Sequence, residues 1–464
     1  MLKRISSKNI QELYSYNEET NAYSFQSEYF VKTVLPSLPK KAIRKSHVLQ
    51  CSDFSTVFAT SDIHADFRKF IQILKDNAFL QTPLDPYTDD IYHPDLIGQA
   101  KWTGPPNTLF VVIGDLVDGR RNHGSLENGP DDPRGSFEFL LLAFLYNLRL
   151  SAIESKSEIL FTIGNHDASS VIRKASCEWF YSMFVTKQAR AFFGSYATRR
   201  QALFPFYSIC PYYMIALHNG LEKEVAFVHG SLHSDNESYR FTNFTEALER
   251  FQISVDEGGK IDDFFRDEYL PNPNPCDRYG AGQTALGPLW SRLYSESPTG
   301  VCDKIQDTGY KTIVVGHCPT SLQEGTNARF QTLLAEQPVK YANCDAGHGL
   351  DDVGLTGCVM MDCESDRTKL LFVDVGMSKG QRTPTQEINN ADRKVQILRL
   401  LHDPTGDASL YYNRMDGLRT DGHIVLLYGK NSLNRLSGGK HRPKSLRRQR
   451  ILRKRTRKYR NRSS

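Results

Sequence analysis

Residues 109–118 constrain the fold of this chain more than any other stretch. Five apolar residues run without a break up to Ile113 and are followed by Gly114 and Asp115. Such a run predicts a strand buried on both faces, with a sharp turn at its end. Asp115 and Asp118 then lie close together at the tip of a buried strand, where two carboxylates repel each other unless a positive partner is near. A metal ion is the simplest such partner.

The order of apolar segments predicts an α/β protein. A strand is expected at residues 56–62 and is followed by apolar residues at helical spacing in residues 66–77, which is a strand–loop–helix unit. A long apolar helix is expected at residues 137–150. Further strands are expected at residues 157–163, 212–217, 224–228, 312–315, 370–375 and 424–428.

Five of the predicted strands end in a short polar cluster. The clusters contain Asp62 and His64, Asp115 and Asp118, Asn165 with His166 and Asp167, His229, and His317. Loops at the carboxyl ends of parallel strands gather at one edge of a sheet, so these side chains are expected to form one site. Oxygen and nitrogen ligands without cysteine favour Mn²⁺, Fe²⁺ or Zn²⁺ in nearly octahedral coordination.

The order of these clusters resembles the calcineurin-like metallophosphoesterase superfamily. The motif at residues 316–319 lacks the second histidine that many members carry, as in phosphoprotein phosphatases. Residues 289–292 resemble the arginine-bearing stretch of that group. Residues 374–380 resemble the late strand of the Shewanella-like protein phosphatases, to which the chain is most similar. The resemblance spans residues 56–380.

The resemblance implies a four-layer α/β/β/α metallophosphoesterase sandwich with inserted loops. The loops are residues 80–107 and 119–136, which flank the site in sequence. The domain organisation that follows is an N-terminal extension at 1–55, a catalytic domain at 56–380, a C-terminal extension packed on the core at 381–436, and a disordered basic tail at 437–464.

The resemblance also implies a site for two metal ions. Asp62 and His64 would hold one ion, Asp115 would bridge both, and Asn165, His229 and His317 would hold the second. Two cations about 3.5–4 Å apart can share one carboxylate and a bridging hydroxide that attacks phosphorus. Mn²⁺ is the expected metal, with iron or zinc as alternatives.

His166 would stay off the metals and act as the general acid, oriented by Asp118. Arg292 would clamp the phosphate with a bidentate contact. Asp167 stands where the family has glutamate, and a structural role is expected for it.

The chain departs from the family pattern directly after Asp118. The family has arginine there, whereas this chain has Gly119 followed by Arg120 and Arg121. Either one of the two arginines reaches the phosphate through a shifted turn, or the contact is lost and the pair is a solvated part of the loop.

Charge is divided unevenly along the chain. The full chain has a formal net charge of +5, but residues 440–462 carry thirteen Lys or Arg and no acid, which leaves −8 on the rest. A run this basic is expected to be disordered alone. It would serve as a nuclear address, as a contact with nucleic acid, or only as a solubilising tail.

The sequence contains neither a secretory signal nor an apolar run long enough to span a membrane. Nine cysteines without a CxxC pair favour reduced thiols, so we expect an intracellular protein, cytoplasmic or nuclear, that is not secreted. Cys344, Cys358 and Cys363 with His348 are an alternative zinc site. Their spacing fits no finger pattern, which favours buried or loop cysteines.

We therefore expect a metal-dependent phosphoric monoester hydrolase. The favoured substrate is a phosphoprotein carrying phosphoserine, phosphothreonine or phosphotyrosine. The alternatives are a dinucleoside polyphosphate hydrolase or a nuclease, which the basic tail makes plausible, and a non-enzymatic binding module. The complete ligand set argues against the last alternative.

Overall fold

The computed structural model describes the greater part of the chain's first 317 residues and several later strands. The described residues are 3–38, 48–84, 90–119, 132, 134–167, 185–209, 214–232, 294, 301–317, 340–343, 359–363, 368–373, 395–402, 408–416 and 419–426. Several predictions fall outside them, and these concern Arg120, Arg121, Arg292, Cys344, His348, Cys358 and the basic tail.

A six-stranded sheet contains the first three predicted strands. Its order is β17-β16-β15-β4-β7-β8. The strands are β4 (Thr56–Ser61), β7 (Thr108–Ile113), β8 (Glu158–Thr162), β15 (Val395–His402), β16 (Ala408–Asp416) and β17 (Arg419–Leu426). The strands β4, β7 and β8 are parallel, whereas β15 to β17 extend the sheet beyond β4 in antiparallel pairs. Residues 395–426 thus add three strands to this sheet.

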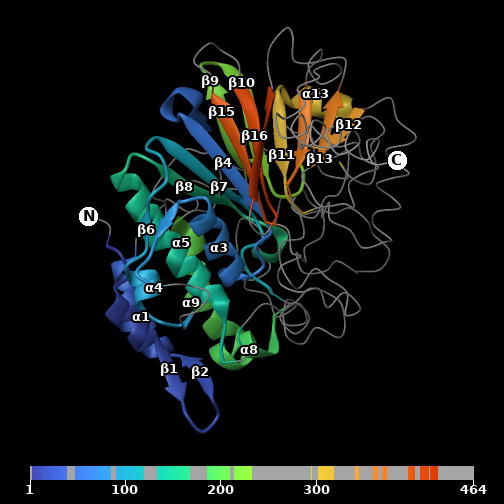
Figure 1. Ribbon diagram of the computed structural model, residues 1–464. Coiled ribbons are helices and arrows are strands. Elements are labelled where there is room, and N and C mark those ends of the chain that lie inside the picture. Colours follow the sequence, from blue (N-terminus) through green and yellow to red (C-terminus); the bar gives the residue numbers. More distant parts are fainter. Residues whose placement is uncertain are drawn as a thin grey trace, which may run out of the picture.

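A seven-stranded sheet faces the first (Figure 1). Its order is β12-β13-β14-β11-β10-β9-β3. The strands are β3 (Val48–Gln50), β9 (Met214–Asn219), β10 (Glu222–Val228), β11 (Thr312–Val315), β12 (Lys340–Asn343), β13 (Val359–Cys363) and β14 (Thr368–Phe372). The central strands β10, β11 and β14 are parallel, so their carboxyl ends share one edge.

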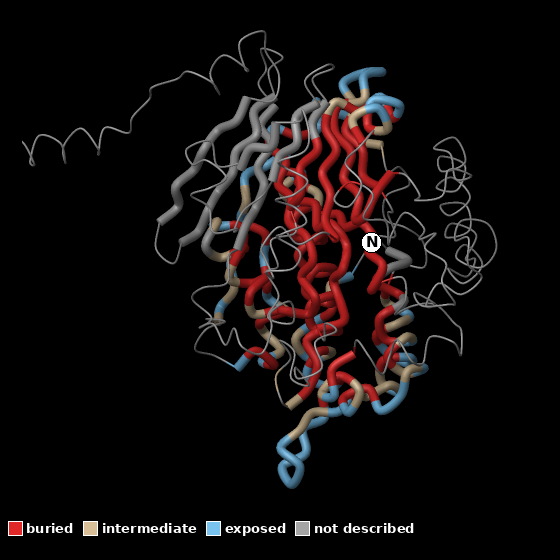
Figure 2. Tube along the Cα trace, turned by 90° about the vertical axis from the view of Figure 1, so that its right-hand side faces the viewer, coloured by how far each residue is buried: buried red, intermediate tan, exposed pale blue. Residues whose placement is uncertain are grey.

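The alternation of side chains along each strand fills two separate cores. Val111 of β7 points between the sheets, where it belongs to one cluster with Phe227 and Val314 of the other sheet. Phe110 and Val112 point the other way, into the cluster that contains the helices. Both faces are buried, which is why these strands read as unbroken apolar runs (Figure 2).

Helices cover the outer faces of the two sheets. The helices α3 (Phe67–Asp76) and α5 (Phe137–Glu154) lie on the six-stranded sheet, α9 (Tyr196–Ile209) packs against α5, and α13 (Val301–Thr308) packs on the other sheet. Asp66 caps α3 by accepting a hydrogen bond from the Lys69 amide at 3.2 Å, and Ser136 caps α5. The predicted four-layer α/β/β/α sandwich is therefore confirmed.

The N-terminal segment packs against the outer helices. It comprises α1 (Ser7–Leu13), the hairpin of β1 (Tyr14–Asn17) and β2 (Ala22–Phe25), α2 (Ser27–Tyr29), η1 (Phe30–Val34) and η2 (Leu35–Ser37). The side chain of Asn147 on α5 accepts a hydrogen bond from the Ile5 amide and donates to the Ile5 and Ile97 carbonyls, each within 3.0 Å. One buried amide thus joins the N-terminal segment and the 80–107 insertion to α5.

The remaining short elements lie in the insertions and next to the core. They are η3 (Cys51–Asp53), β5 (Leu80–Gln81), α4 (Asp95–Gly98), β6 (Lys101–Trp102) and α8 (Lys187–Phe193). No helix in the described part of the chain is long and apolar enough to cross a membrane.

The cysteine prediction fails at one position. Two cysteine side chains belong to the part of the chain that the structure describes, and Cys51 is a free thiol. Cys302, at the start of α13, takes part in a disulfide. The expectation of reduced thiols is therefore wrong for Cys302.

Candidate metal centre

Strand register brings the predicted site residues to one edge of the two sheets. In the six-stranded sheet Ser61 pairs with Ile113, and Ile113 pairs with Thr162, so β4, β7 and β8 end level with one another. In the facing sheet Val228 pairs with Val315 at the ends of β10 and β11. The structure therefore gathers all eight predicted site residues that it describes, namely Asp62, His64, Asp115, Asp118, Asn165, His166, His229 and His317.

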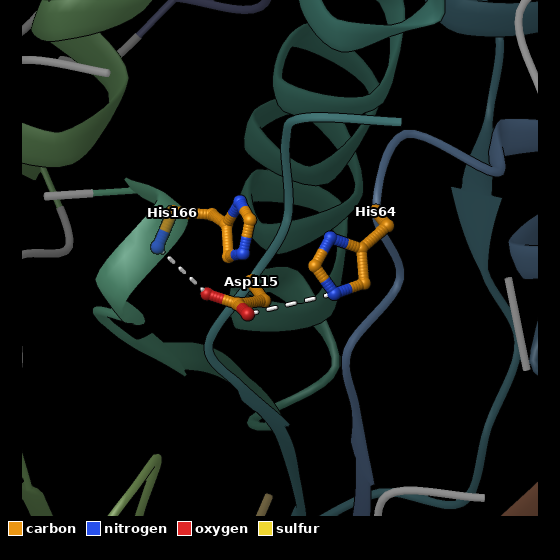
Figure 3. A group of neighbouring side chains, drawn as sticks. All are labelled: His64, Asp115 and His166. Carbon is orange, nitrogen blue, oxygen red and sulfur yellow. Dashed lines mark hydrogen bonds and ion pairs between the residues drawn. The ribbon is translucent and has the colours of Figure 1, made fainter. Parts of the chain in front are cut away.

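The carboxylate of Asp115 lies at the centre of this edge (Figure 3). Its Oδ2 atom is 3.5 Å from Nε2 of His64, whereas Oδ1 is 3.3 Å from Nε2 of His229. Oδ1 also accepts a hydrogen bond from the His166 amide at 3.0 Å. The two oxygens of one carboxylate thus face two different groups of ligands.

One group lies on the side of β4. Nε2 of His64 is 3.8 Å from Oδ1 of Asp62, and Oδ2 of Asp62 accepts a hydrogen bond from the His317 amide at 3.1 Å. Ligand atoms of His64, Asp115 and His166 all lie within 4.8 Å of one another.

The other group lies on the side of the seven-stranded sheet. Nε2 of His229 is 2.8 Å from Oδ1 of Asn165. Ligand atoms of Asp115, His229 and His317 also lie within 4.8 Å of one another. Asp115 is therefore common to both groups.

Ring orientation directs the same nitrogen of two histidines toward Asp115. Nδ1 of His64 lies 3.1 Å from the Asp118 carbonyl and 3.2 Å from that of Val117, and Nδ1 of His229 lies 3.4 Å from the Ile113 carbonyl. A ring nitrogen that faces a carbonyl carries the proton, which leaves Nε2 as the ligand atom.

The backbone around the site adopts a conformation that most residues avoid. Five site residues have positive φ angles, which are 52° for Asp62, 46° for His64, 49° for Asp115, 64° for Asp118 and 60° for His317. Each costs on the order of 1 kcal/mol for a residue with a side chain. Clustered strain of this kind is typical of a site whose geometry is set by function rather than by stability.

Two glycines allow the strands to approach closely. Gly114 has φ of 61°, and a Cβ atom there would overlap the His229 ring. A Cβ atom on Gly164 would overlap the Asp115 backbone and carboxylate. The glycine in each of these motifs is therefore required by the neighbouring ligand.

Burial and charge shift the pKa values of the central pair. Burial alone would raise the pKa of Asp115, but His229, His166 and His64 around it lower that pKa well below its usual value. Burial likewise opposes protonation of His229, yet Asp115 and Asp62 nearby raise its pKa to about 9. The pair therefore favours opposite charges near neutral pH.

His166 and Asp118 form a pair beside this centre. Nδ1 of His166 is 3.3 Å from Oδ2 of Asp118. At 6% exposure His166 is the most accessible of the eight residues. The same ring also lies within reach of the group of His64 and Asp115, so the geometry is compatible with a metal ligand as well as with an acid.

Asp167 holds the loop that carries the two aspartates. Its carboxylate accepts hydrogen bonds from the amides of Leu116 at 2.9 Å, Val117 at 3.4 Å and Gly164 at 2.9 Å. A glutamate is one methylene longer, so the shorter side chain matches this close approach of two strand ends.

Sequence reasoning missed two charged residues behind Asp118. Arg199, in the first turn of α9, donates from Nη2 to Oδ1 of Asp118 at 2.7 Å and from Nε to Oε2 of Glu138 at 2.7 Å. Glu138 carried a signal, because it is a lone acid in the first turn of an apolar helix and interrupts that apolar run. Arg199 carried none, since it is one basic residue among several in its segment.

The donor set fits divalent cations. Asp62, Asp115 and the three imidazoles of His64, His229 and His317 offer hard and borderline ligand atoms at a buried strand edge. Buried carboxylates this close together need positive charge between them. Cysteine is absent from the set, which distinguishes it from a structural zinc site.

Comparison with known proteins agrees with this geometry. A family model described as calcineurin-like phosphoesterase matches residues 55–325, more than half of the chain, and the chain therefore belongs to this family. It is a metal-dependent phosphoester hydrolase, and the family implies divalent metal ions, for which the His and Asp groups above provide ligands. The predicted superfamily is confirmed.

Solved structures that resemble the chain include three phosphatases. A cold-active protein tyrosine phosphatase shares 15% identity over 84% of this chain and 83% of its own, with a TM-score of 0.46. The cold-active protein-tyrosine phosphatase of a psychrophile Shewanella species shares 14% over 84% and 86%, with a TM-score of 0.42. A protein serine/threonine phosphatase from Saccharomyces cerevisiae with similarity to human phosphatase PP5 shares 12% over 84% and 85%, with a TM-score of 0.35.

Likenesses this remote carry no argument about the substrate of this chain. No curated protein matches the chain in sequence.

Proposed function

We propose that this protein is a phosphomonoesterase that removes phosphate from phosphoserine, phosphothreonine or phosphotyrosine in proteins, with a pair of Mn²⁺ ions in its site. The observation that supports a pair is the position of Asp115, whose two carboxylate oxygens face His64 at 3.5 Å and His229 at 3.3 Å. A carboxylate placed between two ligand groups is suited to bridge two cations.

The proposed ligand sets are those that the resemblance to the family implies. Asp62 and His64 hold one ion, Asn165, His229 and His317 hold the other, and Asp115 is shared. When bound, the ions would activate a water molecule and neutralise the charge of the phosphoryl oxygens.

The protein's own acid in this proposal is His166. With Nδ1 turned toward Asp118, Nε2 is left to donate a proton to the leaving oxygen as its bond to phosphorus breaks, and the alcohol departs neutral. The contact with Asp118 fixes the orientation of the ring, so that Nε2 and not Nδ1 faces the leaving oxygen.

Arg292 remains the proposed phosphate clamp. It lies outside the described residues, but Tyr294, two positions further on, is buried and its hydroxyl accepts a hydrogen bond from the Leu232 amide at 3.2 Å. Leu232 follows His229 by three positions. The role of Arg292 itself is proposed from the resemblance of residues 289–292.

A second candidate substrate class is nucleic acid or a dinucleoside polyphosphate. The thirteen cationic residues at 440–462 favour it, because such a run binds polyanions. We rank it second because a basic tail adds affinity for many anions without specifying the bond that is cleaved.

The test is hydrolysis of p-nitrophenyl phosphate with and without Mn²⁺, followed by a substrate panel. We expect Mn²⁺ to stimulate turnover, and a phosphopeptide to be hydrolysed faster than diadenosine tetraphosphate or single-stranded DNA. Repeating the panel on a chain ending before residue 440 isolates the tail. Preference for either nucleotide substrate in both chains would contradict the proposed substrate.

A further inference from the structure

A network of charged side chains lies behind the pair of His166 and Asp118. Arg199 is 1% exposed and contacts two carboxylates at once. Its Nε and Nη2 atoms donate to Glu138 at 2.7 and 2.9 Å, and Nη2 also donates to Oδ1 of Asp118 at 2.7 Å. Oε1 of Glu138 in turn accepts a hydrogen bond from the Asp118 amide at 3.0 Å.

This network holds Asp118 at two points. Its amide is held by Glu138 and its Oδ1 atom by Arg199, which leaves Oδ2 directed at Nδ1 of His166. Asp118 has φ of 64°, a conformation that the chain does not adopt without support. Glu138 holds the guanidinium through Nε and Nη2, which fixes the point from which Nη2 donates to Asp118, whereas a flexible ammonium has no such fixed geometry.

Two simpler roles for Arg199 fit less well. A phosphate ligand must reach the substrate, whereas this guanidinium is enclosed and engaged with two carboxylates. A purely stabilising role is a weak explanation, because a buried ion pair gains little over apolar residues of the same volume. The network lies at the loop of Asp118, whose carboxylate faces His166.

We infer that Arg199, together with Glu138, is a positioning residue for the reaction, which holds Asp118 so that His166 donates its proton along one direction. The inference rests on the proposed role of His166 as the general acid. It adds that α9, 81 positions from Asp118 in sequence, sets the efficiency of that proton transfer.

The test compares two substrates that differ in their need for an acid. Phenyl phosphate has a poor leaving group and requires protonation, whereas p-nitrophenyl phosphate has a good one and requires little. The variant is Arg199→Lys, which keeps the positive charge but loses the paired donors Nε and Nη2 of the guanidinium. We expect kcat for phenyl phosphate to fall about tenfold or more and kcat for p-nitrophenyl phosphate about threefold or less, with KM little changed.

The matched control is Arg149→Lys. Arg149 lies on the same helix as Glu138, is equally buried, and donates from Nε to Glu158 at 2.7 Å. Glu158 begins β8, whereas the site follows the end of that strand, so the control loses a similar ion pair away from the site. In this control we expect any change in kcat, relative to the unmodified protein, to be the same factor for phenyl phosphate and for p-nitrophenyl phosphate.

A second variant covers the case in which Arg199→Lys does not fold. Replacing Arg199 by Met and Glu138 by Gln removes both charges and keeps an acceptor for the Asp118 amide. The same selective loss on phenyl phosphate is expected for this double variant.

Three outcomes decide the inference. Selective loss on phenyl phosphate in the Arg199 variants, with His166→Asn showing the same selectivity more strongly, supports it. Equal loss on both substrates, as in Arg149→Lys, overturns it while leaving His166 as the acid. Absence of selectivity in His166→Asn itself overturns both the inference and the proposed acid.

Discussion

The two ends of the central strands differ in the burial of their charged side chains and in backbone conformation. At the carboxyl ends, charged side chains are buried, and five residues adopt left-handed backbone conformations. At the opposite end, Lys311 pairs with Glu222 and Glu224 at 2.6 Å, but Lys311 is 40% and Glu222 65% exposed. Exposed pairs cost little to form and contribute little to stability. The comparison indicates that strain and buried charge are concentrated where ligand geometry has to be fixed.

The largest effect is expected from the bridging carboxylate. Asp115→Asn removes the charge that two cations would share, so activity on p-nitrophenyl phosphate should fall by at least about a thousandfold. Metal content, measured by mass spectrometry of the purified protein, should fall as well. The matched change at the opposite end, Glu222→Gln, should leave both unchanged. Activity retained in Asp115→Asn would show that the buried carboxylate at the carboxyl ends is not required for catalysis. The two ends of the strands would then not differ in function as proposed.

The next effect concerns the acid. His166→Asn should lower kcat for phenyl phosphate by about a hundredfold or more, since proton donation to the leaving group is lost. Metal content should remain that of the unmodified protein, because His166 is not among the proposed ligands. Loss of one metal ion in this variant would instead identify His166 as a ligand, which its distance to His64 and Asp115 permits.

Two glycines with similar φ angles allow the energetic cost of a steric contact to be measured apart from the cost of the backbone conformation. Gly114 and Gly220 have φ angles of 61° and 63°, but a Cβ atom would meet His229 at Gly114 and nothing within 4 Å at Gly220. Gly220→Ala should lower the free energy of unfolding by about 1 kcal/mol, the cost of the conformation alone. Gly114→Ala should cost about 2 kcal/mol more, because the His229 ring must move.

Denaturant unfolding of both glycine variants measures this difference, and activity provides a second readout. We expect Gly220→Ala to retain full activity and Gly114→Ala to lose metal affinity. Equal destabilisation with full activity in both variants would argue that the ends of the strands are not under different constraints.

The smallest effect is a pH dependence that originates at His229. Its pKa of about 9 lies above the unfolded value of 6.5, so protonation stabilises the metal-free fold fully below pH 6.5, and this contribution is lost as pH rises toward 9. A metal ion must displace that proton, so apparent metal affinity should rise about tenfold per pH unit within this window. Titration calorimetry in buffers of different ionisation enthalpy measures the released proton. Affinity independent of pH from 6.5 to 9 would contradict the assignment.

The strands and their polar ends were accessible from sequence because both signals are local. Residues 109–113 read as a buried strand, and the glycine and aspartate after them read as a turn, as the structure has it in β7. The rule that parallel strands end at one edge gathers the clusters within each sheet. The packing of the two sheets face to face, which brings His229 to Asp115, does not follow from that rule.

The missed features depend on contacts between distant segments. Arg199 and Asp118 are 81 positions apart, and nothing in the local pattern of α9 shows that one of its arginines points toward the site. Likewise β15 pairs with β4 across more than 300 positions, so residues 395–426 read as an extension rather than as part of the central sheet. Tertiary packing, and not the local secondary-structure propensity of these residues, determines both the contact of Arg199 with Asp118 and the pairing of β15 with β4.

Anomalous scattering from crystals of the protein grown with Mn²⁺ would locate the metal ions relative to Asp115. We expect two peaks about 3.5–4 Å apart, one on each side of the Asp115 carboxylate, with His64 beside one and His229 beside the other. A single peak, or a pair of peaks that does not share Asp115, would contradict this arrangement.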